Sequence, residues 1–217
     1  MNKKKKLSII FNVLIFVFVL FGSIMAFGKI TVIPVSSDSG NILKYFTVQS
    51  NILAGIVALL YVIFYIKNKD KDIKVPFFVF VLKYIATIDL LITFLVVALF
   101  LGFITPDGYI SVYYNANFFF HLIVPILNII SFIFFEPFYF VKKIQTLFGV
   151  IHLFIYSIFY QIVAISHFEN GKVDIKYDWY AFAQNGVIVA LLFAVVLLAI
   201  GYLTAFAFWK IKIKRKN

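Results

Sequence analysis

The sequence predicts an all-α membrane protein with six transmembrane helices in one bundle. Of its 217 residues, 64% are hydrophobic and 13% charged, and the mean hydropathy is +1.03. In soluble domains about half of the residues are apolar and about a quarter are charged. The apolar residues also gather in long runs, whose ends carry most of the lysines. These three observations describe a chain that folds in lipid.

Six apolar runs are long enough to cross a hydrocarbon core, which takes about 20 helical residues. They cover residues 7–27, 45–66, 75–101, 117–135, 145–166 and 181–209. No linker, repeat or low-complexity tract separates them, so we expect residues 1–217 to form a single domain. The chain has no cysteine, which leaves neither a disulfide framework nor a thiolate ligand.

The basic residues indicate the topology. If both termini are cytoplasmic, fifteen of the 20 Lys and Arg residues lie inside, four lie outside, and Lys83 lies within a span. Cytoplasmic loops carry such an excess, and basic helix ends attract anionic headgroups. We therefore expect both termini in the cytoplasm, and the net charge of +11 does not indicate a nucleic-acid partner. The fifteen are residues 3–6, 67, 69, 71, 74, 142, 143, 210, 212 and 214–216.

The first run also has features of a signal peptide, because four lysines precede it and small residues lie near its end. The apolar part of a signal peptide is typically about 7 to 15 residues long. Residues 7–27 exceed that length and match a full crossing. We therefore expect a retained helix.

Two outer loops are long enough to fold over the membrane surface. Residues 28–44 contain Pro34 and the string Ser36-Ser37-Asp38-Ser39-Gly40, which is typical of irregular structure. Residues 166–180 carry ionisable side chains that we expect to be solvated. An outer aromatic belt explains five further residues: Tyr109, Tyr113, Tyr114, Trp179 and Tyr180.

Polar side chains lie near the outer ends of two spans. Thr47, Ser50 and Asn51 fall in the first two turns of the second span, and spacings of three and four residues place them on one face. His121 falls about one turn into the fourth span, with Asn128 below it on one stripe. At a rise of about 1.5 Å per residue, Thr47 and His121 lie at similar depth. A hydroxyl and an imidazole are the two halves of an activated nucleophile.

Ionisable residues inside a span indicate a partner or a pathway, because lipid makes charge costly. Asp89 lies past the middle of the third span, with Thr93 one turn nearer the outside. A structural pair with Lys83 or His121 is one explanation of Asp89. Snorkelling toward the interface explains Lys83. His152 lies two turns into the fifth span from the cytoplasm, and we expect it in the other leaflet, outside any site.

The uncharged polar residues also have structural interpretations. Thr and Ser in membrane helices often bond to a carbonyl one turn earlier, and Asn and Gln often join helices. For Ser50, Asn51 and Asn128, helix packing is as good an interpretation as a place in a site. Pro125 is explained by a kink that opens space beside His121.

Two strings resemble a known family. Tyr45-Phe46-Thr47-Val48-Gln49-Ser50-Asn51 at a helix start, followed two spans later by His121-Leu122-Ile123-Val124-Pro125, resembles the bacterial Pr6Pr membrane proteins. These are related to the androgen-induced protein and the androgen-dependent TFPI-regulating protein of animals. The resemblance covers span count, span order and the position of both strings over nearly the whole chain. It weakens where relatives carry a Tyr-Pro pair and a proline-containing aromatic string, since this chain has Tyr156-Ser157 and Tyr177-Asp178-Trp179-Tyr180.

In the animal members an intramembrane Thr and a His hydrolyse fatty acid esters of hydroxy fatty acids. The resemblance therefore implies Thr47 as nucleophile and His121 as its base, in a bacterial plasma membrane. An orienting carboxylate would assist the imidazole, and Asp89 is the acid at a suitable depth. Ser50 and Asn51 are candidate oxyanion donors. We expect the substrate pocket to include Gln49, Thr93, Pro125, Asn128 and Gln184.

Two other functions remain open. Intramembrane charge at Asp89, Lys83 and His121 also suits a small transporter or channel with an ion or proton path. A non-catalytic lipid-binding protein would have the same composition. Three histidines at different depths do not suggest a metal site, and no glycine-rich phosphate loop is present. We expect no cofactor, and the partners we expect are membrane lipids, with no protein partner indicated.

Overall fold

The computed structural model describes residues 3–33, 41–68, 74–105, 107–140, 142–169 and 172–214. Pro34, the string 36–40 and four of the basic residues (Lys69, Lys71, Arg215 and Lys216) lie outside these ranges. The described part is mostly helical, and six of its helices are long and apolar enough to cross a membrane. This confirms the helical fold class and supports a multi-pass membrane protein.

The six helices have nearly the predicted bounds. They are α1 (Lys3–Phe27), α2 (Phe46–Lys67), a third from Phe77 to Ile104, a fourth from Ala116 to Phe134, a fifth from Lys143 to Ser166, and α8 (Val187–Lys214). The third comprises α3 (Phe77–Val96), a π-helical turn η2 (Val97–Leu101) and α4 (Gly102–Ile104). The fourth comprises α5 (Ala116–Phe118), a π-helical turn η4 (Phe119–Ile123) and α6 (Val124–Phe134). The fifth comprises the 3₁₀ helix η5 (Lys143–Val150) and α7 (Ile151–Ser166). Short 3₁₀ helices η1 (Ile42–Lys44) and η3 (Tyr109–Tyr113) lie between spans.

The structure differs from the prediction in the last outer loop. Strands β1 (Phe168–Glu169) and β2 (Lys172–Val173) form a short antiparallel hairpin that hydropathy does not reveal. The last helix begins at Val187 and not at 181, because Ala181 and Gly186 have positive φ angles of 58° and 104°. The carboxylate of Asp178 accepts the N–H of Ala183 at 3.0 Å and holds this turn in place.

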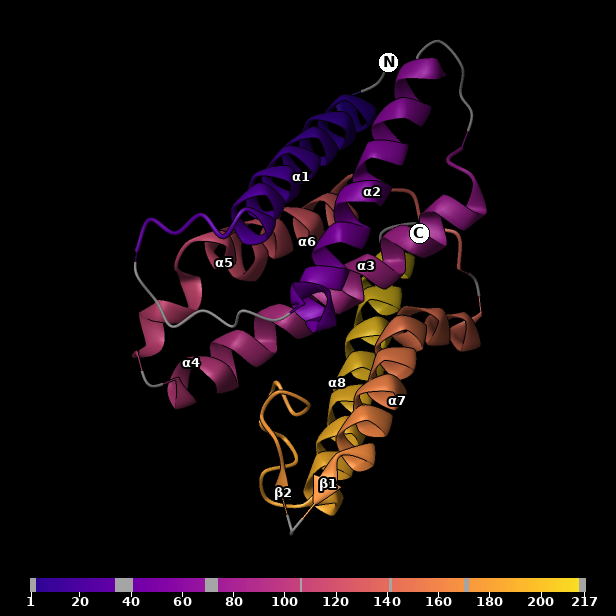
Figure 1. The fold of residues 1–217 in the computed structure, drawn as a ribbon. Helices are drawn as coiled ribbons and strands as arrows, with labels where there is room; N and C mark the ends of the chain where they lie inside the picture. The colour runs from indigo at the N-terminus through magenta and orange to yellow at the C-terminus, as the bar shows by residue number, and fades with distance from the viewer. Residues whose placement is uncertain are drawn as a thin grey trace.

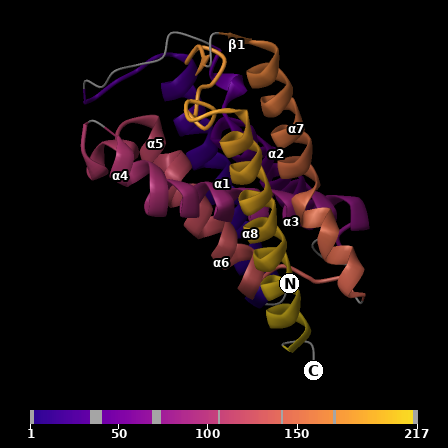
Figure 2. The same ribbon diagram turned by 90° about the horizontal axis from the view of Figure 1, so that it is seen from below.

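The helices form two neighbouring groups. α1 packs against α2 and α6, and α7 lies beside α8 with the β hairpin at the tip of that pair (Figure 1). α3 contacts both groups. Seen from below, both termini lie toward one end of the molecule and the β hairpin lies at the opposite end (Figure 2). This is the arrangement expected of an even number of spans.

α1 is an integral part of the bundle. A Cβ added at Gly55 of α2 would lie 2.7 Å from Cγ1 of Val19, and one added at Gly22 would lie 2.5 Å from the Phe120 ring. Glycines at these two positions allow the helices to approach closely, as is usual in membrane helix pairs. α1 therefore packs within the bundle at close range to α2 and η4.

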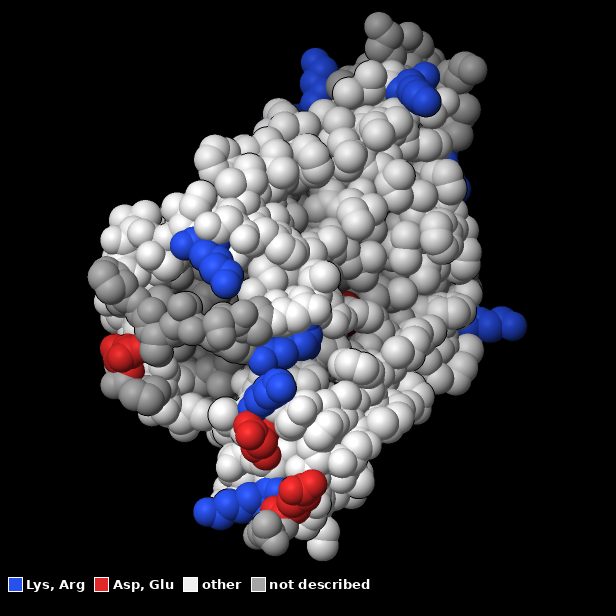
Figure 3. Space-filling view, in the orientation of Figure 1, with Lys and Arg blue, Asp and Glu red and all other residues white. Residues whose placement is uncertain are grey.

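The core is aromatic and joins α3, α6, α7 and α8. Phe80 and Tyr84 of α3 pack against Phe132 and Phe140, and all four side chains are buried. The outer surface has a broad uncharged band: in Figure 3 the charged side chains lie at the top and along the right edge, and again across the lower left of the visible face, with uncharged residues in the band between these two groups. Such a belt suits a hydrocarbon environment.

Candidate functional site

Thr47 lies in the first turn of α2, and two neighbouring side chains fix its backbone. Its carbonyl accepts the Ser50 hydroxyl at 3.0 Å and the Asn51 amide at 2.8 Å. The Asn51 amide nitrogen also donates to the Phe120 carbonyl at 3.1 Å. These bonds use the hydroxyl proton of Ser50 and both amide protons of Asn51. In this structure the two side chains hold the first turn of α2 and join it to η4, with the Asn51 amide directed at two backbone carbonyls.

His121 lies in the π-helical turn η4, just before Pro125. Proline has no N–H, so the His121 carbonyl cannot accept the usual helical bond from residue 125. π turns are frequent at functional sites. His121 is 9% exposed, and its Nδ1 lies 2.6 Å from the Val112 carbonyl. Because a carbonyl only accepts, Nδ1 carries the proton, and the neutral ring keeps a lone pair on Nε2.

Thr47 and His121 line one cavity of about 580 Å³. Its wall includes polar side chains from several segments between the spans, among them Lys29, Ser111 and Asn115. Among the described residues no hydrogen bond joins the two side chains. The neighbouring helices meet directly, through the bond from Asn51 to Phe120. The predicted proximity of the second and fourth spans is thus present.

A second, narrower cavity of about 60 Å³ also reaches Thr47. Its wall is mainly apolar and comes from α3, η2, α7 and α8, with Ile92, Val96, Leu153 and Leu197 among its members. Thr93 lies in the same wall. This space suits a slender apolar group better than a polar headgroup.

The two cavities share three lining residues: Thr47, Leu101 and Tyr180. Tyr180 comes from the loop before α8, and its hydroxyl oxygen accepts the backbone N–H of Phe46 at 2.9 Å. The sequence predicted that Tyr180 lies in an aromatic belt, and it did not reveal the position of Tyr180 beside Thr47. The only signal in the sequence was the aromatic string before the last span, in which the family resemblance weakened.

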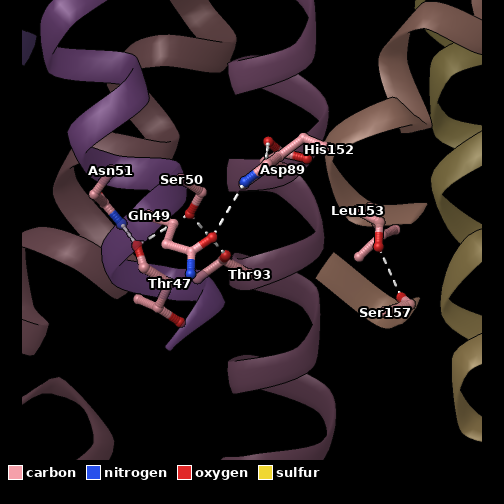
Figure 4. Close-up of polar contacts among 9 residues, drawn as sticks. All are labelled: Thr47, Gln49, Ser50, Asn51, Asp89, Thr93, His152, Leu153 and Ser157. Atoms are coloured by element: carbon pink, nitrogen blue, oxygen red, sulfur yellow. Dashed lines mark hydrogen bonds and ion pairs between the residues drawn. The ribbon is translucent and has the colours of Figure 1, made fainter. Parts of the chain in front are cut away.

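Asp89 has a different partner from either of those expected. It is fully buried, and its Oδ2 lies 2.7 Å from Nδ1 of His152 on α7. The other ring nitrogen of His152 lies 3.3 Å from Oε1 of Gln49 on α2 (Figure 4). Gln49 is oriented by its amide nitrogen, which donates to the Leu43 carbonyl at 2.7 Å. Asp89 therefore joins three helices and does not orient His121.

The position of His152 corrects the prediction that it lies in the other leaflet. Along α7, His152 contacts Gln49, and Tyr156 donates to the Lys44 carbonyl at 2.7 Å. The α7 helix is therefore displaced along the bundle relative to α2. Depth counted from the start of a span cannot detect an axial offset between two helices.

The remaining predicted pocket residues lie elsewhere. Asn128 is buried and donates to the Thr87 hydroxyl at 2.8 Å. Gln184 donates to the Val173 carbonyl at 2.9 Å and to Asp178 at 2.8 Å, which fixes the last outer loop. Neither residue, nor Pro125, lines the two cavities described. Gln49 is likewise beside the site and not in its wall.

Lys83 does not snorkel, because it is fully buried in a second polar cluster. Its ammonium donates to Asn12 Oδ1 at 2.8 Å, and the amide of Asn12 donates to Glu136 at 2.6 Å. Glu136 also accepts from Ser8 and Ser131, both at 2.9 Å. Burial raises the pKa of Glu136. This cluster joins α1, α3 and the end of α6, and it is separate from the pair of Asp89 and His152.

In the part of the chain that the structure describes, no three His, Asp or Glu side chains could hold a metal ion. The walls of the two cavities that Thr47 lines contain hydroxyl groups, the imidazole of His121 and the side chains of Lys29 and Asp107. A hydroxyl and an imidazole are the groups that acyl transfer uses.

Comparison with protein-family models, with curated proteins and with solved structures gave no match to this chain.

Proposed function

We propose that this protein hydrolyses lipid esters within the membrane, with Thr47 as nucleophile and His121 as general base. The observation that carries the proposal is that Thr47 lines both a narrow, almost entirely apolar cavity and a wider cavity whose wall is partly polar and includes His121. An ester of a fatty acid matches these two cavities. Its apolar acyl chain would lie in the narrow cavity, and its more polar alcohol part would lie in the wider one. Fatty acid esters of hydroxy fatty acids are one such class.

In the proposed reaction the Thr47 hydroxyl oxygen attacks the ester carbonyl carbon, and Nε2 of His121 takes the hydroxyl proton. The bond from the carbonyl carbon to the alcohol oxygen breaks, and the alcohol leaves with the proton from the imidazolium. Water from the wider cavity then attacks the acyl ester on Thr47 and gives a proton to His121. The fatty acid leaves as the Thr47 hydroxyl is restored.

Among the described residues no hydrogen bond joins Thr47 and His121, so the proposed reaction requires the two side chains to approach each other when substrate binds. Catalytic hydrogen bonds are often long without substrate and tighten in the reacting complex. The Val112 carbonyl supports the base by keeping the proton on Nδ1, which leaves Nε2 as acceptor. The Val112 carbonyl thus orients the imidazole of His121, which was the role expected of Asp89.

The proposal includes a topology. Both termini lie in the cytoplasm of a bacterial cell, and the site lies in the outer half of the plasma membrane. The chain has no cysteine, so single cysteines can be introduced without a background. A cysteine replacing Lys176 should react with an impermeant maleimide on intact cells, and one replacing Lys67 only after permeabilisation. The reverse pattern would overturn the orientation.

The test of the chemistry uses purified, folded protein, a fluorophosphonate probe and a panel of ester lipids. Wild type should be labelled and should release fatty acid; Thr47→Ala and His121→Ala should do neither, whereas Thr47→Ser should keep part of both. Thr204→Ala is the matched control, because Thr204 bonds to the Gly201 carbonyl within α8 and lines neither cavity. The hydrolysis rate should also fall as acid protonates His121. Undiminished turnover by Thr47→Ala would overturn the proposal.

Two outcomes would favour the alternatives. Lipid that is retained by wild type without turnover would indicate a lipid-binding protein. Ion or proton flux in liposomes that survives Thr47→Ala would indicate a transporter.

A further inference from the structure

The wall of the wider cavity carries one cation and one anion. Lys29 comes from the segment after α1, and Asp107 comes from the segment after α4. Both residues are exposed, and neither side chain forms a hydrogen bond or an ion pair with another residue that the structure describes. Two opposite charges in one cavity are therefore not paired with each other, and both are available to a ligand.

Three backbone turns of an uncommon kind lie in the same wall. Lys29, Asn115 and Ala181 are the described residues other than glycine that have positive φ angles, of 51°, 56° and 58°, and all three line the wider cavity. Residues with a Cβ adopt this conformation rarely, and such residues cluster at sites that hold ligands. At Lys29 the turn ends α1, since the N–H of Ile30 donates to the Met25 carbonyl at 2.9 Å. Glycine is the usual residue at such a helix end, and this chain has a lysine there.

Hydrogen bonds between loops hold this wall in place. The Asn115 side chain accepts the N–H groups of Val32 and Ile33 at 2.7 and 3.0 Å, and it donates to the Ile33 carbonyl at 2.8 Å. The segment that carries Lys29 is thereby fixed to the loop before α5. The volume of about 580 Å³ is in the range of small-molecule pockets, about 300–1,000 Å³. A wall that is formed in advance lowers the cost of ordering a ligand.

The same cavity also has an apolar side that faces the surroundings of the bundle. Ile30 and Ile104 line it and are 50% and 55% exposed. In a bilayer these two side chains would contact lipid. A ligand with charged groups at one end and hydrocarbon at the other therefore fits this cavity better than a small polar solute.

We propose that the wider cavity binds a zwitterionic phospholipid headgroup, with the phosphate at Lys29 and the headgroup ammonium at Asp107. A zwitterion uses both charges of the wall, whereas a purely anionic headgroup would be repelled by Asp107. This inference rests on the proposed function and names its substrate class. One acyl chain of the phospholipid lies in the narrow cavity, and the other remains in the bilayer beside Ile30 and Ile104.

The reaction is the one described above, applied to this substrate. The Thr47 hydroxyl oxygen attacks the acyl carbonyl carbon, and the bond from that carbon to the glycerol oxygen breaks. The lysophospholipid leaves with the proton from the His121 imidazolium. Water then releases the fatty acid from Thr47.

The experiment measures kcat/KM for three lipids with identical acyl chains in micelles of an uncharged detergent: phosphatidylethanolamine, phosphatidylglycerol and diacylglycerol. Wild type should prefer phosphatidylethanolamine to both others. Lys29→Gln should lower kcat/KM about 3- to 10-fold for the two phospholipids and leave diacylglycerol unchanged. Asp107→Asn should lower it by a similar factor for phosphatidylethanolamine alone. These factors are modest because water and salt screen exposed charges.

Two charged residues of the β hairpin provide matched controls. Lys172 and Glu169 are exposed and line neither cavity. Lys172→Gln and Glu169→Gln should therefore leave the order of the three lipids unchanged.

Binding is measured apart from turnover with diether lipids, which have no ester to cleave. Native mass spectrometry of Thr47→Ala should show more diether phosphatidylethanolamine than diether phosphatidylglycerol retained. Adding Lys29→Gln or Asp107→Asn to this variant should remove the difference.

The outcomes separate this inference from the proposed function. If hydrolysis depends on Thr47 but is equal for the three lipids, or is confined to esters without a headgroup, the headgroup site is overturned and the proposed function stands. A preference for phosphatidylglycerol would also overturn the site, because it would indicate an anionic ligand. If no ester is hydrolysed while the diether lipids bind as expected, the proposed function fails and the headgroup site stands.

Discussion

The pair of Asp89 and His152 allows a sharp test, because a structural and a catalytic carboxylate predict very different losses. We consider Asp89→Asn, which keeps the shape of the side chain and removes its charge. Asp89 is fully buried, whereas the side chain of His152 is 26% exposed. Water can therefore reach part of the His152 ring when the charge of Asp89 is removed. The loss in unfolding free energy should then be smaller than for a fully buried pair.

The expected loss can be bounded from these exposures. Breaking a fully buried pair costs about 3–5 kcal/mol, and a hydrogen bond to a charged group contributes about 1.5–3 kcal/mol. With one partner partly solvated, we expect Asp89→Asn to lower the free energy of unfolding by about 2 kcal/mol. In folded protein, we expect kcat/KM to fall by less than about tenfold, because Asp89 contacts neither Thr47 nor His121.

The assay combines thermal unfolding in detergent with ester hydrolysis per folded molecule. A double-mutant cycle with His152→Gln should give a coupling energy of about 1–3 kcal/mol in stability. Glu169→Gln, on the exposed strand β1, is the control and should change neither quantity. If Asp89 oriented the catalytic imidazole, Asp89→Asn would lower kcat by about 10⁴-fold, as removal of that charge does in catalytic triads. Such a loss without coupling to His152 would refute the structural assignment.

Three further predictions concern other parts of the molecule. The pKa of Glu136 is raised by burial above its usual 4.5, so the folded state binds this proton more tightly than the unfolded state. The protonated carboxyl group therefore contributes stability at low pH, and this contribution is lost as pH rises from about 4.5 through the raised pKa. In Glu136→Gln the melting temperature should change less with pH over this range. A Cβ at Gly55 would lie 2.7 Å from Val19, so Gly55→Val should cost about 1–3 kcal/mol in unfolding free energy. Leu197→Trp should fill the narrow cavity and lower kcat/KM for long acyl chains at least about tenfold while sparing short ones.

The predictions for Gly55 and Leu197 each have a control on the same helix. Ile56→Ala, next to Gly55 but 53% exposed, should change stability by less than about 1 kcal/mol. Leu192→Trp, on α8 and 60% exposed, should leave chain-length preference unchanged. Equal effects of Gly55→Val and Ile56→Ala would contradict the close packing of α1, and equal effects of the two Trp variants would contradict an acyl chain in the narrow cavity. A pH dependence that persists in Glu136→Gln would contradict the assignment to that carboxyl group.

The sequence alone determined the six helices and much of their length. A chain in hydrocarbon must satisfy its backbone hydrogen bonds within each segment, so a long apolar run has few alternatives to a helix. The sequence also placed Thr47 and His121 near the N-terminal ends of two spans, because the rise along a helix is fixed. It did not reveal the start of α8 at Val187, which depends on positive φ angles at Ala181 and Gly186.

Only the tertiary structure decided which polar groups meet. The axial offset of α7 brings His152 to Asp89 and Gln49, and the return of the last outer loop brings Tyr180 to Thr47. The Lys83 ammonium donates a hydrogen bond to Asn12 on α1, and Lys83 is therefore buried. Depth within a span depends on local geometry, which residue spacing encodes. Offsets between helices and the paths of loops depend on packing across the whole bundle, and no single segment encodes them.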